Sequence, residues 1–332
     1  MEEARKLLAG ESPSRERRSW LYPSGRMGLR AREDFHMLRS GTENGRRSWV
    51  LGLGLAITLL GAPAMAGPKA ATKAAEKQEA FFGREELARQ AKVHEEGCKK
   101  GDKGECFNSA LAYAQGAGVT KDDARAAALY KKACDKGHLD ACNNLGIAYA
   151  EGAGVQKDPK QALALFDKSC KAEDAKGCFN VGLAYNAGLG VDKDPVRAGA
   201  SFEKACAKGH ADGCFSLAIA HASGKGLEKN LEKSTALFSK ACDAGHMTAC
   251  NSLGVAYMAG HGVAKDPKRA VSLFEKTCAA ELPGGCLNAG IAHRSGSGVA
   301  KSPERSREFI QKACDLGLEP ACKVLQAAAK AP

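Results

Sequence analysis

The cysteines of this 332-residue chain follow a strict rule: the gaps between them alternate between 8 and 28 residues. A shift of 36 residues therefore reproduces the surrounding sequence without an insertion or deletion. A fixed period of this length is typical of repeat proteins, in which each copy buries its apolar face against its neighbours. The cysteines that mark the period are Cys98, Cys106, Cys134, Cys142, Cys170, Cys178, Cys206, Cys214, Cys242, Cys250, Cys278, Cys286, Cys314 and Cys322.

Each 36-residue unit contains the pattern of two helices. In the copy that begins at Cys134, the first helix is predicted over roughly 140–151 and the second over roughly 159–170. Apolar residues in the first recur at Leu145, Ala148 and Tyr149, which is the spacing of a helix with one buried face. The unit is therefore predicted to be a helix hairpin.

A Gly-x-Gly pattern separates the two helices in every copy. Glycine in all six copies indicates positive φ at the end of the first helix and in the turn after it. The second helix then starts at Asp158-Pro159 or its equivalent, an N-cap followed by proline at the first helical position. The glycine pairs are Gly116 and Gly118, Gly152 and Gly154, Gly188 and Gly190, Gly224 and Gly226, Gly260 and Gly262, and Gly296 and Gly298.

A small residue in the middle of each first helix faces a large residue in each second helix. Mid-helix glycine costs about 1 kcal/mol relative to alanine, so close approach of a neighbouring helix is expected to offset it. The small residues are Ala110, Gly146, Gly182, Ala218, Gly254 and Gly290. The large residues are Tyr130, Phe166, Phe202, Phe238, Phe274 and Ile310.

These motifs, together with the Cys-x7-Cys pair, resemble the Sel1-like repeats, which are relatives of the tetratricopeptide repeat. The resemblance covers residues from about 84 to 326 and implies an all-α, right-handed α/α superhelical solenoid. More narrowly, the chain is similar to secreted cysteine-rich Sel1-like proteins, several of which carry a β-lactamase label. Binding of a protein or peptide and hydrolysis of a β-lactam are therefore both implied.

The chain divides into four expected regions. Residues 1–36 match no repeat and precede Met37, a plausible translation start. Residues 37–66 have the basic, apolar and small-residue segments of a signal peptide, with cleavage expected between Ala66 and Gly67. A linker is expected over 67–83, followed by the solenoid over 84–330, with six full periods and end caps. Export to the periplasm or outside the cell follows, with no membrane segment after signal removal.

The cysteines could form disulfides or bind a metal. Three Cys-x3-His-x3-Cys copies, at His138, His210 and His246, offer three ligands each. The other four pairs lack that histidine, and an oxidising compartment favours disulfides. Pairing across 28 residues would leave Cys98 and Cys322 alone, whereas pairing across 8 residues uses all fourteen cysteines. Seven local disulfides are therefore predicted, with no metal and no cofactor.

No catalytic constellation emerges from the sequence. Ser201 and Lys204 match the Ser-x-x-Lys start of a serine β-lactamase motif, but its companion motifs are missing. His221 and His293 stand where other copies carry tyrosine, so packing explains them. The net charge is +11 overall and +7 from residue 67 onward. These charges alternate in sign along the helices, which indicates a solvated surface and no nucleic-acid partner.

One polar position of the repeat is a candidate binding site. It lies two residues after the second cysteine of each pair and comprises Asn108, Asn144, Asn180, Ser216, Ser252 and Asn288. These side chains either bond to the backbone of the first helical turn or form a ladder along a concave groove. The favoured function is a scaffold that holds a protein or peptide, with a component of the cell envelope as one candidate partner. The alternative is a β-lactamase or penicillin-binding hydrolase with a β-lactam ligand.

Overall fold

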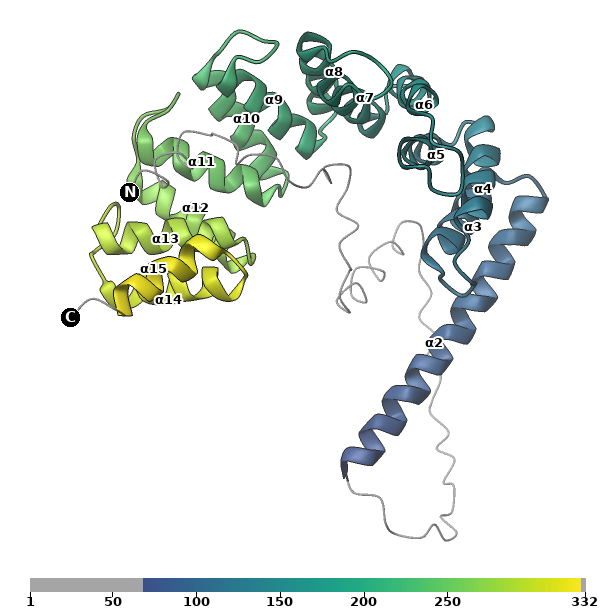
Figure 1. The fold of residues 1–332 in the computed structure, drawn as a ribbon, viewed down its shortest axis with the longest axis horizontal. Helices are drawn as coiled ribbons and strands as arrows, with labels where there is room; N and C mark the ends of the chain where they lie inside the picture. The colour runs from purple at the N-terminus through teal and green to yellow at the C-terminus, as the bar shows by residue number, and fades with distance from the viewer. Residues whose placement is uncertain (1–67, 330–332) are drawn as a thin grey trace, which may run out of the picture. The chain divides into compact units, whose positions relative to one another are not determined.

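The structure is a computed structural model that describes residues 68–329 (Figure 1). Within these residues the chain forms fourteen helices and no strand. The helices are α2 (Pro68–Lys99), α3 (Lys103–Gln115), α4 (Asp123–Asp135), α5 (Leu139–Glu151), α6 (Pro159–Lys171), α7 (Ala175–Ala187), α8 (Pro195–Ala207), α9 (Ala211–Ser223), α10 (Leu231–Asp243), α11 (Met247–Ala259), α12 (Pro267–Ala279), α13 (Pro283–Ser295), α14 (Pro303–Asp315) and α15 (Glu319–Ala329).

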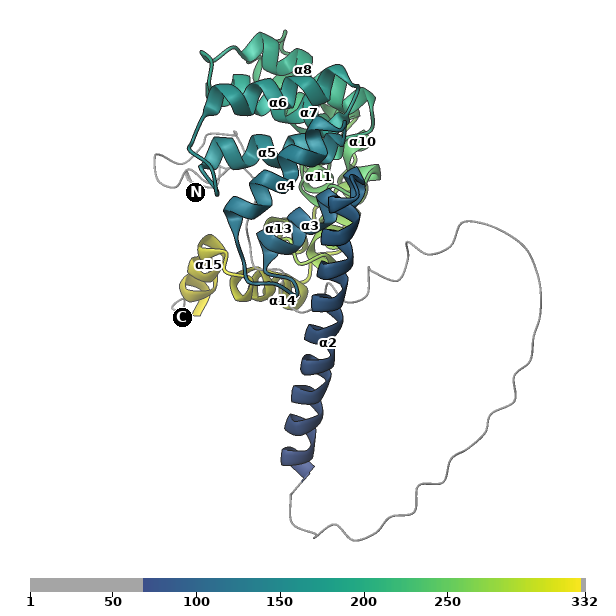
Figure 2. The ribbon, with the colours of Figure 1, turned by 90° about the vertical axis from the view of Figure 1, so that its right-hand side faces the viewer.

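Helices α3 to α14 form six hairpins, in which the odd-numbered helix is the first helix of a unit and the even-numbered helix is the second. Each helix packs against the helix before it and the helix after it in the chain (Figures 1 and 2). Within the described residues, α2 lacks a first helix before it and α15 lacks a second helix after it. The fold is the predicted all-α, right-handed α/α superhelical solenoid.

The helix ends follow the predicted local chemistry. The Asp158 carboxylate accepts hydrogen bonds from the backbone amides of the first turn of α6, and Pro159 opens that helix. Gly152 ends α5 in the left-handed region, with φ of 82°. Gly154 also has positive φ, and a Cβ atom there would overlap the Asp123 backbone at the start of α4. The second glycine therefore lets each loop lie directly on the preceding unit.

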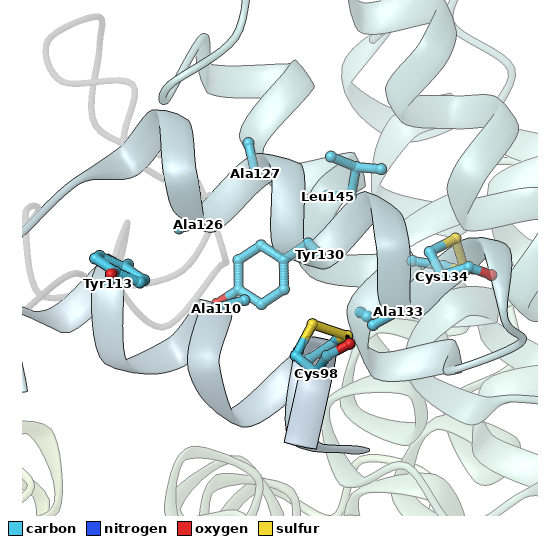
Figure 3. Packing of buried hydrophobic residues seen from close by; sticks show 12 residues of the cluster. Cys98, Ala110, Tyr113, Ala126, Ala127, Tyr130, Ala133, Cys134 and Leu145 are labelled. Carbon is cyan, nitrogen blue, oxygen red and sulfur yellow. Dashed lines mark hydrogen bonds between the residues drawn. A yellow bond between two sulfur atoms is a disulfide. The ribbon is translucent and has the colours of Figure 1, made fainter. Parts of the chain in front are cut away.

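The small and large positions interlock as predicted. A Cβ atom on Gly146 would lie 2.5 Å from the Phe166 ring, so only glycine lets α5 and α6 approach this closely. In the first unit Tyr130 lies beside Ala110 in the core (Figure 3). Burying each such aromatic ring contributes about 1.5–3 kcal/mol, which offsets the helix-propensity cost of the glycine.

The fourteen cysteines form seven disulfides, each joining partners eight residues apart. Each bridge closes the turn from a second helix into the next first helix, with Cα atoms 4.4–4.8 Å apart. By chain entropy a loop this short contributes about 2–3 kcal/mol per bridge. The solenoid is therefore stapled at every junction between units.

The N-terminal helix differs from the expected boundary. The repeat pattern predicts a linker at 67–83 and the start of the helix near Arg84, whereas α2 begins at Pro68. Alanine, lysine, glutamate and glutamine dominate this stretch, and these strong helix formers continue the helix. The predicted extension 1–36, the predicted signal peptide 37–66 and the predicted cleavage site between Ala66 and Gly67 fall outside the described residues. No helix within 68–329 is both long and apolar enough to span a membrane.

Candidate binding face of the first helices

The polar residues singled out in the sequence lie in the first turns of the first helices. We call Asn108, Asn144, Asn180, Ser216, Ser252 and Asn288 the polar row. Asn180 is buried and the other five are half-buried. Each follows the second cysteine of a disulfide by two residues, so the disulfide fixes the backbone that carries it.

Three members of the polar row form side-chain hydrogen bonds within the chain, which we call engaged, and three do not, which we call unengaged. The Asn144 amide bonds to the Tyr130 phenol, and this bond partly offsets the rise that burial causes in the phenol's pKa. Asn288 Nδ2 donates to Asn251 Oδ1 at 2.9 Å, and Ser252 Oγ donates to a carbonyl of its own helix at 3.0 Å. Within the described part of the chain, three members form no side-chain hydrogen bond: Asn108, Asn180 and Ser216. The hydrogen bonding of the row therefore differs from unit to unit.

A second row, which was not among the predicted site residues, lies three residues further along each first helix. It is aliphatic in all six units, although a soluble surface would favour polar residues there. Ile219 is 45% exposed and Ile291 is 40% exposed, and the other four members are half-buried. We call Leu111, Ile147, Leu183, Ile219, Val255 and Ile291 the aliphatic row. Comparing the six units position by position would have revealed it.

The two rows lie on neighbouring sides of the first helices, and four members of the aliphatic row also pack against the core: Leu111, Ile147, Leu183 and Val255. Successive helix residues are about 100° apart, so residues three apart are separated by about 60° around the axis. Ile147 and Asn144 therefore share a face of α5. Gly146, which contacts Phe166 of α6, marks a different side of the same helix. Together the polar row and the aliphatic row define the first-helix face.

The charges beside the first-helix face are paired with one another. Asp140 at the start of α5 lies 2.7 Å from Lys176 at the start of α7. Asp212 at the start of α9 accepts a bond from His246 Nε2 at 3.2 Å, and this bond holds the pKa of the carboxyl below its ordinary value. Neither row contains a charged residue. The face therefore offers uncharged polar and aliphatic groups.

The three histidines considered as metal ligands are helix caps. The Nδ1 atom of each accepts a hydrogen bond from the backbone amide three residues later, at 3.0–3.3 Å. Each ring also stacks on a phenylalanine of the preceding first helix, with centroids 4.4–4.7 Å apart. The stacked pairs are Phe107 with His138, Phe179 with His210, and Phe215 with His246. Since the neighbouring sulfur atoms bond to each other, the metal interpretation is wrong for these histidines.

The residues considered for catalysis have structural partners. Ser201 Oγ donates to the Arg197 carbonyl of its own helix at 2.8 Å, and the side chain is buried. His221 Nδ1 donates to the Glu228 carbonyl at 3.2 Å. His293 Nε2 lies 3.0 Å from a Glu275 carboxylate oxygen. These three side chains belong to different units of the solenoid.

Helix hairpins that repeat every 36 residues, each packed against the helices before and after it, define the class of α/α repeat scaffolds. Six segments match the Sel1 repeat: 106–138, 139–174, 175–210, 211–246, 248–281 and 283–318. The matches cover more than half of the chain, so the chain belongs to the Sel1 repeat family. No curated protein matches it.

Several solved structures are similar to this chain. One is c5321, a protective antigen of uropathogenic Escherichia coli with an SLR fold, at 27% identity and a TM-score of 0.65. The match covers 74% of this chain but only 56% of that one. A Sel1 repeat protein from Oxalobacter formigenes matches at 26% identity and a TM-score of 0.57, covering 60% of this chain and 85% of that one. Cysteine rich protein B of Helicobacter pylori matches at 33% identity and a TM-score of 0.33, covering 40% of this chain and 95% of that one.

Proposed function

We propose that this protein is an exported scaffold that binds a peptide or protein segment along the first-helix face. The observation that carries the proposal is the aliphatic row. Six consecutive units keep a half-buried or exposed aliphatic side chain at one position, next to an uncharged polar position. An exposed apolar surface rimmed by polar groups is characteristic of an interaction site.

The two rows suit the recognition of an extended chain. Apolar side chains of a partner gain about 25 cal/mol for each Å² that they bury on the aliphatic row. Asparagine carries both a donor and an acceptor, so Asn108, which is half-buried and forms no side-chain hydrogen bond, can bond to a partner's backbone. Seven disulfides hold the frame, which reduces the conformational entropy lost on binding.

Export to the periplasm or outside the cell is part of the proposal. Seven disulfides form and persist in an oxidising compartment, and residues 37–66 have the pattern of a signal peptide. N-terminal sequencing of the exported protein is expected to read from Gly67. A mature chain that retained residues 49–60 would contradict this proposal.

A peptide library tests the binding function. Peptides selected from a displayed random library on the wild-type protein are expected to lose affinity for the double variant Ile219→Ser and Ile291→Ser. Both side chains are exposed, so the fold should tolerate the change. Val196→Ser is the matched control, because Val196 is an aliphatic residue, 62% exposed, on the second helix α8. Selected peptides that bound the double variant and wild type equally well would contradict the proposed face.

The β-lactamase or penicillin-binding alternative rests on the resemblance to labelled proteins, and a direct assay separates it from the scaffold. Acyl transfer needs an activated nucleophile and a group that stabilises the oxyanion, whereas the Ser201 hydroxyl bonds to a backbone carbonyl. The scaffold proposal predicts no nitrocefin turnover above background. Turnover that disappears in Ser201→Ala would overturn the proposal and establish the hydrolase.

A further inference from the structure

Lysine occupies one position of the loop between the two helices in all six units. It lies five residues after the glycine that ends the first helix, and all six side chains are exposed. We call these residues the lysine row: Lys121, Lys157, Lys193, Lys229, Lys265 and Lys301. A Cβ atom built on the helix-ending glycine would lie 3.0–3.4 Å from the Cβ or Cγ atom of the lysine in every unit. The same local geometry therefore presents a lysine at the same place six times.

The loops that carry the lysine row lie on the preceding units without a gap. A Cβ atom on Gly154 would overlap the backbone of Asp123, and one on Gly298 would overlap the backbone of Pro267. The same overlap with the preceding second helix occurs at Gly118, Gly190, Gly226 and Gly262. Loops and second helices therefore touch along all six units, and we call the surface that they form the hairpin-loop edge. It comprises residues 116–125, 152–161, 188–197, 224–233, 260–269 and 296–305.

Positive charge exceeds negative charge on the hairpin-loop edge. Its basic residues outnumber its acidic residues by fourteen to nine. Within residues 68–329, Lys121 pairs with Asp123, whereas the other five members of the lysine row form no ion pair. Four of the nine acidic residues are N-caps that accept hydrogen bonds from backbone amides: Asp122, Asp158, Asp194 and Asp266. The five ammonium groups are therefore available to a partner of opposite charge.

A second basic position lies four residues after the lysine in five of the six units. Arg125, Arg197 and Arg269 are held against the protein. Each Nε atom lies 3.4–3.7 Å from the N-cap carboxylate, and each Nη1 atom donates to a tyrosine hydroxyl at 2.8–3.4 Å. Lys233 and Arg305 follow uncharged N-caps and form no ion pair in the described part of the chain. Pairing with the cap therefore does not account for the basic residue in these two units.

The contrast between these arginines and the lysine row indicates the chemistry of the partner. Guanidinium groups recognise phosphate through two parallel N–H bonds, but the three paired arginines direct Nε and Nη1 at groups of the protein. A lysine ammonium is a point charge on a flexible stem, which suits the single charge of a side-chain carboxylate. We infer that the hairpin-loop edge binds an acidic segment of a protein partner, whose carboxylates pair with the lysine row. This surface is separate from the first-helix face and does not depend on it.

Fluorescence anisotropy with a labelled oligoglutamate peptide tests the inference. The wild-type protein is expected to bind the peptide, and more weakly as salt is added, because salt screens exposed charges. The triple variant Lys229→Gln, Lys265→Gln and Lys301→Gln should lose about tenfold in affinity, as the loss of three exposed ion pairs predicts. All three side chains are exposed, so the fold should tolerate the change.

The control must remove the same charge from the same kind of place, because a cation near a helix C-terminus also stabilises the helix. The triple variant Lys204→Gln, Lys276→Gln and Lys312→Gln meets this condition. These lysines are exposed and lie in the last turns of second helices, at the ends far from the hairpin-loop edge. The control should bind oligoglutamate within about twofold of wild type. Circular dichroism melts of both triple variants confirm folding.

The other outcomes overturn the inference. Equal losses in the two triple variants would mean that net charge alone attracts the peptide. Undiminished binding by the first triple variant, or no binding by wild type at low salt, would remove the lysine row as a site. Tighter binding of a polyphosphate of equal charge would show that carboxylates are not the preferred ligand. Loss of oligoglutamate binding in the double variant Ile219→Ser and Ile291→Ser would place the peptide on the first-helix face instead.

Discussion

The turn between α10 and α11 and the turn between α12 and α13 carry the same eight-residue disulfide, yet different side chains fill them. In the first turn, Ala241 and Ala249 stand beside the bridge, and both are fully buried. In the second turn, the equivalent residues are Thr277 and Gly285, and a Cβ atom on Gly285 would lie 2.8 Å from Thr277 Cβ. Extra bulk on one side is thus matched by its absence on the other.

The same two turns also differ at the bend and at the helix cap. Gly245 takes the left-handed conformation in the first, with φ of 88°, and Glu281 takes it in the second, with φ of 59°. His246 caps α11 with its side chain, whereas Leu282 gives α13 no side-chain cap. Both turns are closed by the same eight-residue disulfide. The repeat therefore tolerates a compensated change, as at Thr277 and Gly285, and also uncompensated changes, as at Glu281 and Leu282.

The turn between α6 and α7 shows a matched pair of polar side chains. Asp174 caps α7, and Asn143 of the preceding first helix donates to its carboxylate at 2.7 Å. Where the cap is histidine, as at His246, the residue in the Asn143 position is a phenylalanine that stacks on the ring. The residue that caps one first helix and the residue that covers it from the preceding helix therefore change together.

The largest predicted effect comes from breaking the pair beside the disulfide. Gly285→Ala forces a methyl group against Thr277 and is expected to lower the free energy of unfolding by about 2–3 kcal/mol. Adding Thr277→Ala recreates the pair found at Ala241 and Ala249 and should restore most of the loss. Urea denaturation measures both variants. Equal destabilisation of the single and double variants would show that the two positions are not matched.

The next largest loss of stability is expected when the helix-capping residue no longer matches the residue that contacts it from the preceding first helix. Asn143→Phe removes the bond to Asp174 and places a ring over a carboxylate, which should cost about 2 kcal/mol. The double variant Asn143→Phe and Asp174→His converts this turn to the phenylalanine–histidine type and should recover much of that loss. A double-mutant cycle by thermal denaturation gives the coupling energy. A coupling energy near zero would contradict the pairing.

Glu281→Gly should stabilise the turn between α12 and α13. A left-handed conformation costs a residue with a side chain about 1 kcal/mol relative to glycine, so an increase of about that size is expected in urea denaturation. The reciprocal change Gly245→Ala should destabilise by a similar amount, because no atom lies within 4 Å of the added Cβ and only the backbone conformation is penalised. Stability changes of the same sign in both variants would refute this interpretation.

The fold was predictable because every local signal repeats with one period. The glycine pairs, the Asp-Pro starts and the cysteine spacing each specify a backbone conformation at a known position. Their agreement over six units left one helix-hairpin architecture. The N-terminal boundary was missed, because the repeat columns stop near Arg84 while helix-forming residues continue back to Pro68.

The candidate site was only partly predictable, because side-chain partners depend on contacts between units. The position of Asn288 was found from the period, but its bond to Asn251 of the preceding first helix was not. The cap role of His210 was missed, because a histidine between two cysteines has the spacing of a metal ligand. Aspartate at the same position in other units, such as Asp174, carried the signal of an N-cap.

The smallest predicted effect is a difference in how stability depends on pH between turns capped by histidine, such as His210, and turns capped by aspartate, such as Asp174. Burial lowers the pKa of His210 from its ordinary value of 6.5, and Lys176 lowers it further, against the opposing charges of Asp212 and Asp174. The folded state therefore binds a proton less readily than the unfolded state. Stability from this cap is present above the unfolded pKa and is lost as the pH falls through 6.5 toward the folded value.

His210→Asn isolates this contribution, because asparagine accepts the same backbone hydrogen bond and does not titrate. Urea midpoints measured from about pH 7.5 to about pH 5.5 should fall in both proteins as other groups titrate, but less steeply in the variant. Protonation would also place a positive charge at the N-terminus of α9, where the helix dipole disfavours it. Identical slopes would mean that His210 binds its proton equally well folded and unfolded, and the pH distinction between the two kinds of turn would fail.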